Sequence, residues 1–191
     1  MRYVGQAFMG YFYFDFRNTD KQDCHGLVAS LLTQLSSQSG PHFDILSRLY
    51  SDHDSGARKP SDIVLARCMT EMLTLPDQRP TYLIMDALDE CPNTSDCPSP
   101  RETVLRLIKG LVGSRIPNLH ICVTSRPEMD IQHILGPLTS YRVALHEEYG
   151  QREDINQYIR AMVYSDRKMR RWREEDKELV INTLSERSSG M

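Results

Sequence analysis

Two short apolar runs, each ending in a cluster of polar residues, constrain the fold of this chain most strongly. Thr81–Met85 follows a proline and runs directly into an acidic segment, and Leu119–Val123 runs into Thr-Ser-Arg. Short apolar runs bounded by turn signals are typical of strands that are buried on both faces of a parallel sheet. Parallel strands cannot be joined by tight turns, so the sequence must also supply crossover connections, usually helices.

The rest of the chain supplies those helices and two further strand candidates. Aromatic residues predict a strand over 11–16, and Tyr141 begins a weaker candidate over 141–145. Apolar spacings of three and four residues predict helices over 24–37 and 42–50 and helices beginning near Ser61 and Ser99. We therefore expect an α/β fold: a three-layer, mostly parallel sheet with helices on both faces over residues 1–148, followed by a helical region over 149–191.

Composition excludes several classes of protein. The 191 residues are 40% hydrophobic and carry a net charge of −3, which predicts a folded domain with no affinity for nucleic acid. No apolar run is long enough to span a membrane, so we expect no membrane partner. The 5 cysteines form no CxxC pair, which argues against a zinc ribbon and favours reduced thiols in a cytoplasmic protein.

The acidic segment after the first apolar run is the strongest chemical signal. Asp86 directly follows the predicted strand, and Asp89 and Glu90 come three and four residues later. A carboxylate at a strand end can hold Mg²⁺ against nucleotide phosphates, and a second can orient an attacking water. This spacing matches the Walker B element of P-loop NTPases. The alternative interpretation is an acidic turn whose carboxylates cap a helix.

The polar cluster after the second apolar run is a weaker signal of the same kind. Thr124, Ser125 and Arg126 would lie at the carboxyl end of a strand, where open α/β sheets bind their ligands. An arginine there could reach a γ-phosphate as a bidentate donor. The alternative is an arginine in a surface salt bridge. We expect the two clusters to lie close together, and this proximity favours a nucleotide site.

Together, the segments DALDEC, TSRPE and YFYFDF resemble a NACHT-type NTPase of the STAND class, akin to the nucleotide domain of NOD-like receptors and closest in wording to fungal members. The resemblance implies an ATP- or GTP-binding switch in signal transduction and innate immunity. It implies that Asp86 serves Mg²⁺, that Asp89 and Glu90 serve water activation, and that Arg126, with Thr124 and Ser125 beside it, senses the γ-phosphate. It further implies oligomerisation with other NACHT chains, and ankyrin or WD40 repeats in the intact protein.

The sequence departs from this family in one respect that bears on activity. No G-x-x-x-x-G-K-[ST] segment occurs in the 191 residues, although this loop supplies the amides and the lysine that hold the β-phosphate. In the family the loop would precede the strand at 11–16, and its own strand would lie between the TSR strand and 141–145. We therefore expect a partial NTPase core that is inactive by itself.

Two other functions remain open from the sequence. A non-catalytic scaffold or interaction domain could keep the NTPase fold without binding nucleotide. A nuclease could use strand-end carboxylates to bind Mg²⁺, although that would need further acidic residues converging on Asp86.

Overall fold

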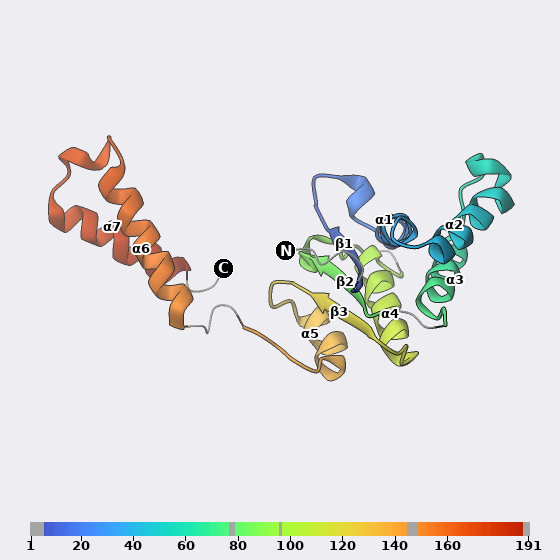
Figure 1. The fold of residues 1–191 in the computed structure, drawn as a ribbon. Helices are drawn as coiled ribbons and strands as arrows, with labels where there is room; N and C mark the ends of the chain where they lie inside the picture. Colours follow the sequence, from blue (N-terminus) through green and yellow to red (C-terminus); the bar gives the residue numbers. More distant parts are fainter. Residues whose placement is uncertain (1–5, 77–78, 96, 145–148, 189–191) are drawn as a thin grey trace. The chain divides into compact units, whose positions relative to one another are not determined.

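The computed structural model describes residues 6–76, 79–95, 97–144 and 149–188, and these residues form two compact units, Met1–Thr139 and Ser140–Met191. The first unit is α/β and the second is helical (Figure 1). In the first unit the elements are β1 (Phe8–Tyr13), α1 (Cys24–Ser36), α2 (Gly40–Asp52), α3 (Asp62–Leu73), β2 (Thr81–Asp86), α4 (Pro100–Gly113), β3 (Leu119–Val123) and α5 (Met129–Leu135). The second unit contains α6 (Tyr149–Ser165) and α7 (Glu174–Ser188).

The three strands form one parallel sheet in the order β1-β2-β3, which confirms the α/β fold class (Figure 1). The register pairs Phe8 with Thr81 and Thr81 with Leu119. All three strands therefore begin level with one another and run in the same direction. The carboxyl ends of β2 and β3 therefore lie side by side. This arrangement places the two polar clusters next to each other, as the sequence predicts.

The helices of the first unit cover one face of the sheet. Side chains on that face, such as Phe12, Leu83 and Met85, join one hydrophobic core with residues of α1, α3, α4 and α5. Gly10 also lies on this face, and it leaves room for α1, since an added Cβ would come within 2.9 Å of the Leu31 side chain. Leu27, Leu31 and Leu35 of α1 are fully buried in the core.

Among the described residues of the first unit, no helix covers the opposite face of the sheet, contrary to the expectation of helices on both faces. We call it the bare face, and its side chains are exposed or half-buried: Met9, Tyr11, Tyr13, Tyr82, Ile84, His120 and Cys122. The reason lies in the strand order. Because β1-β2-β3 advances in one direction, two right-handed crossovers place their helices on the same face.

The two edges of the sheet differ. At the β1 edge, the side chains of Gln34 in α1 and of Gln38, two residues after α1 ends, each accept from and donate to the backbone of β1. Gln34 pairs with Tyr11 at 3.0 and 2.7 Å, and Gln38 pairs with Met9 at 2.9 and 2.7 Å. These two amides replace a neighbouring strand. At β3, Thr124 and Asn118 bond to β2, so the alternate residues Leu119, Ile121 and Val123 direct their backbone groups to the outer edge, where no described strand pairs with them.

Two predicted strands need correction. β1 spans Phe8–Tyr13 and not 11–16, because alternation of buried Phe8 and Phe12 with exposed tyrosines sets its register against β2. The strand predicted over 141–145 is absent over 141–144, where the chain is irregular and Tyr141 is 92% exposed; residue 145 lies outside the described residues. A strand needs a neighbour for its backbone hydrogen bonds, and no described strand pairs with this segment.

Two helices start where the sequence predicts, and a side-chain cap accounts for one of these starts. Ser99 caps α4 by accepting from the Glu102 amide at 3.1 Å, with Pro100 at the first helical position. Ser61 precedes α3 as predicted, although its side chain makes no capping hydrogen bond.

The second unit is an antiparallel pair of helices, α6 and α7, joined by polar contacts. Arg160 of α6 forms an ion pair with Glu178 of α7 at 2.7 Å, and Val163 and Ile181 are buried. The division after Thr139 falls nine residues before the predicted boundary at 148/149, which stays a prediction. Among the described residues, no helix has both the length and the apolar character needed to cross a bilayer.

Candidate functional site

The candidate site lies where β2 and β3 end. The chain leaves β2 at Asp86, and Ala87 adopts a left-handed conformation with φ 54° and ψ 47°. This reversal leads into a short 3₁₀ turn, Leu88–Glu90, which we call the acidic turn. Left-handed backbone is unfavourable for alanine, and such strain is characteristic of functional sites.

Asp86 and Thr124 meet across the ends of the two strands. The Thr124 hydroxyl donates a short hydrogen bond to Asp86 Oδ1 and accepts from the Ala87 amide at 3.0 Å. Backbone bonds fix the pair, since the Thr124 amide donates to Met85 at 2.9 Å and the Thr124 carbonyl accepts from Leu88 at 3.0 Å. Asp86 Oδ2 has no hydrogen-bond donor among the described residues, so one carboxylate oxygen remains able to ligate a cation.

Asp89 and Arg126 form the second cross-strand pair. Asp89 Oδ1 accepts from the Arg126 amide at 3.0 Å, and Asp89 Oδ2 lies 3.4 Å from Arg126 Nε. The Asp89 side chain is 10% exposed, whereas that of Arg126 is 76% exposed. The aspartate is therefore a fixed anchor, and the guanidinium at its surface can reach a ligand in solvent. Ser125, between the two pairs, donates to the Arg126 carbonyl at 2.7 Å.

Glu90 points away from this pair. Its Oε2 accepts from the Phe16 amide at 3.3 Å, which ties the acidic turn to the chain just after β1. Cys91, the next residue, is fully buried and donates from Sγ to the Gln22 carbonyl at 3.1 Å. Burial raises the pKa of the Cys91 thiol to about 12, so this thiol stays protonated and holds the turn as a hydrogen-bond donor.

The structure thus brings five of the six predicted residues into two contacting pairs and their link, and it places Glu90 on the β1 side. It also shows that Asp89 and Glu90 are both engaged by protein donors. Both carboxylates therefore have a structural role in the folded chain, and the water activation that the resemblance implies stays a prediction. A nuclease-like cluster is not supported: the described residues contain no group of three or more His, Cys, Asp or Glu side chains able to hold a metal ion.

Sequence reasoning missed Arg101, which lies behind the acidic turn. This arginine is 8% exposed and donates to the Asp89 and Cys91 carbonyls at 2.6 and 2.9 Å. A signal for it exists in the sequence: a cation in the first turn of a helix opposes the helix dipole, so it needs specific acceptors.

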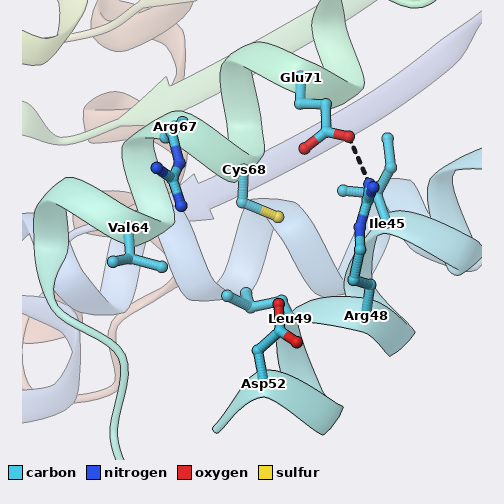
Figure 2. Close-up of a pocket in the computed structure, with 8 residues that line it drawn as sticks. All are labelled: Ile45, Arg48, Leu49, Asp52, Val64, Arg67, Cys68 and Glu71. Carbon is cyan, nitrogen blue, oxygen red and sulfur yellow. Dashed lines mark hydrogen bonds and ion pairs between the residues drawn. The ribbon is translucent and has the colours of Figure 1, made fainter.

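A separate pocket of about 260 Å³ lies between α2 and α3 (Figure 2). Arg48, Arg67, Asp52 and Glu71 line it together with apolar side chains and Cys68, and Arg48 pairs with Glu71. Its charges largely compensate one another, and none of its lining residues belongs to the strand ends. We therefore place the candidate site at β2 and β3 and not here.

Comparison with known proteins identifies a family. A model of the family described as "Nephrocystin 3, N-terminal" matches residues 4–126, which is more than half of the chain. The matched range begins before β1 and ends at Arg126, so it contains all six candidate residues. Neither the curated proteins nor the solved structures that were compared gave a match. The chain belongs to the nephrocystin 3 N-terminal family.

Proposed function

We propose that this chain is part of a nucleotide-binding regulatory module, a switch NTPase of the STAND type as the motifs suggest. The matching family is the nephrocystin 3 N-terminal domain and not the fungal NACHT module. The NACHT-type mechanism, the link to innate immunity, the attached repeats and the assembly with further NACHT chains all belong to this proposal. The observation that supports it most is the pair of contacts Asp86–Thr124 and Asp89–Arg126 at adjacent strand ends.

The residues present fit a magnesium–nucleotide complex. Asp86 would hold the Mg²⁺ through the carboxylate oxygen that Thr124 leaves free, and the ion would neutralise phosphate charge there. Arg126, largely exposed, would contact the terminal phosphate of ATP or GTP. Thr124 orients Asp86, and Asp89 limits the directions that Arg126 can take.

The open edge of β3 fits the same proposal. The backbone groups of Leu119, Ile121 and Val123 face outward at that edge, where a P-loop strand would pair in this class of NTPase. The bare face of the sheet would then be covered by the helix that follows such a loop. Without these parts the chain would bind nucleotide weakly, because the β-phosphate lacks its cradle of amides.

Paramagnetic broadening of NMR signals tests the proposal, because it detects a bound metal ion even when the affinity for nucleotide is low. Titration with Mn²⁺·ATP should broaden the amide signals of Ala87, Leu88 and Thr124 selectively, since a paramagnetic ion at Asp86 relaxes only nearby nuclei. Asp86→Asn should abolish this selective broadening while leaving the fold intact. Asp44→Asn, which removes an exposed carboxylate of α2, is the matched control and should keep it.

A scaffold without nucleotide binding is the second candidate. It is favoured by the engagement of Asp89 and Glu90 with backbone amides, and by the lack of a G-x-x-x-x-G-K-[ST] segment in the 191 residues. Broadening that is uniform, or that centres on the acidic start of α7, in a well-folded chain would favour this candidate over the NTPase.

A further inference from the structure

Arg101 is the charged residue of the α/β unit whose burial the proposed function leaves unexplained. It occupies the first turn of α4, directly after Pro100, where the helix dipole disfavours a cation. It is nevertheless 8% exposed. A buried guanidinium in an unfavourable dipole persists only if its N–H groups find specific acceptors.

The acceptors of Arg101 lie on the segment that follows β2 and on α5, the helix that follows the end of β3. Nη2 donates to the Asp89 carbonyl at 2.6 Å and Nε donates to the Cys91 carbonyl at 2.9 Å. The guanidinium is therefore hydrogen-bonded to the backbone of the acidic turn and of the residue after it. Nη1 pairs with Asp130 of α5 at 3.3 Å. Because α5 begins three residues after Arg126, the same side chain joins the end of β2 to the segment that follows β3.

The contact at Asp89 is the most informative. Arg101 holds this residue by its carbonyl oxygen, and Arg126 holds it by its carboxylate. Two arginines therefore bind one aspartate, the buried Arg101 at its backbone and the largely exposed Arg126 at its side chain. Any displacement of the Asp89 backbone moves the carboxylate that anchors Arg126.

The network around Asp130 strengthens the link. Asn93 donates to Asp130 Oδ2 at 3.2 Å and accepts from the Ser99 hydroxyl at 3.1 Å, and the Ser99 hydroxyl also caps α4. The loop between the acidic turn and α4 is thus tied to α5 by two routes, Arg101 and Asn93.

We infer that Arg101 is a positioning residue: it sets the place of the acidic turn and, through Asp89, the place of the phosphate-contacting Arg126. The inference rests on the proposed function where it concerns nucleotide, and on the contacts alone where it concerns the turn. A lysine would keep the charge but could not reach three acceptors in the plane of a guanidinium.

Three variants of Arg101 and a control separate positioning from general stability. Arg101→Met keeps the length of the side chain and removes the guanidinium, and Arg101→Lys keeps the charge. Arg106→Met is the matched control, because Arg106 lies on the same helix, is 62% exposed at its side chain and pairs only with Glu102 among the described contacts. Hydrogen exchange of single amides is measured in the 191-residue chain.

We expect Arg101→Met and Arg101→Lys to accelerate exchange at Glu90, Cys91 and Arg126 at least tenfold more than at Leu83 in β2. Arg106→Met should accelerate none of these amides. In Arg101→Ala, added methylguanidinium should restore protection at the turn, whereas methylammonium should not. Equal acceleration at Leu83 and at the turn, or full protection in Arg101→Lys, would overturn the inference.

The Mn²⁺·ATP titration of the same variants distinguishes the two proposals. If wild-type chain shows selective broadening and Arg101→Met loses it together with protection of the turn, both proposals are supported. Selective exchange at the turn without broadening in the wild type supports the positioning role and overturns the nucleotide site. Broadening and turn protection that both survive in Arg101→Met overturn the positioning role and leave the nucleotide site standing.

Discussion

Two single residues, one at the candidate site and one in the core, carry strain or buried polarity that the rest of the fold must offset. Ala87 has φ 54° in a position between β2 and the acidic turn, and its amide still donates to Thr124. His42 is 1% exposed inside the core, where its ring meets Phe8 edge-on at 4.7 Å and Nε2 lies 3.2 Å from the Met72 carbonyl. For each of the two residues we predict how a substitution changes the free energy of unfolding.

Ala87→Gly should raise the free energy of unfolding by about 0.5–1 kcal/mol, because glycine adopts left-handed backbone without a Cβ clash. Urea unfolding measures the change. Ala29→Gly, in the middle of α1, is the control and should lower stability by about 1 kcal/mol. A loss of stability in Ala87→Gly would show that the Cβ of Ala87 contributes packing that exceeds its strain.

His42 should make the α/β unit sensitive to acid. Burial lowers the pKa of His42 from its usual 6.5, so below that pH the unfolded chain takes up a proton that the folded chain refuses. Stability is therefore unaffected above pH 6.5 and falls as pH drops from there through the folded pKa, by up to about 1.4 kcal/mol per pH unit. Denaturant unfolding across this range should show the slope in wild type and lack it in His42→Gln.

The exposed His133 of α5 supplies the control for that experiment. His133→Gln should retain the acid slope of the wild type. Parallel stability curves for wild type and His42→Gln would assign the acid sensitivity to other groups.

At the scale of elements, α1 and the turn that follows it do more than fill the core: they also cover one edge of the sheet. Gln34 lies in the last turn of α1 and Gln38 lies two residues after the helix ends, and their partners Tyr11 and Met9 are two residues apart on β1. Each glutamine amide therefore lies beside one outward-facing residue of the edge strand. Four backbone groups of the edge strand are satisfied in this way. An edge that is covered like this cannot pair with another chain.

The double variant Gln34→Met and Gln38→Met keeps side-chain length and removes all four hydrogen bonds. We expect it to lower the free energy of unfolding by about 1–3 kcal/mol, since each net hydrogen bond contributes about 0.5–1.5 kcal/mol and water replaces part of the loss. Exchange of the Met9 and Tyr11 amides should accelerate. Thr33→Met on the exposed side of α1 is the control, and an equal loss there would mean that methionine on α1, and not the edge contact, causes the effect.

At the scale of the whole molecule, stability is divided between two units. The hydrophobic core runs from Phe8 to Ile131 within the first unit, and the buried Val163 and Ile181 belong to the helix pair. The first unit combines a sealed β1 edge with an open β3 edge and a bare apolar face. Open edges and contiguous apolar patches favour association.

The 191-residue chain should therefore self-associate as its concentration rises. Charges on the bare face should reduce this association without unfolding the chain, because Tyr11 and Tyr82 are each 43% exposed. Light scattering after gel filtration should show a smaller mass for Tyr11→Lys with Tyr82→Lys than for wild type. Phe43→Lys, at an exposed aromatic site on α2, should not change the mass; a similar decrease there would indicate a general charge effect.

The sequence by itself determined the local features of this protein. Asp86 and Thr124 could be placed at strand ends because apolar runs and the residues that stop them are neighbours in the chain, and the start of α4 could be read from Ser99-Pro100 because caps act over one turn. The α/β class followed from the alternation of these elements. The specific roles of the six site residues remain predictions.

Only the tertiary structure decided the features that join distant residues. The register of β1 depends on its pairing with β2, and the segment at 141–144 is irregular because a strand requires a neighbour. The partners of Asp89, Gln34 and Arg101 lie 37, 23 and 29 residues away, in Arg126, Tyr11 and Asp130. Sequence periodicity shows that a side chain faces inward or outward, but the packing of the helices on one face of the sheet determines which polar groups it meets there.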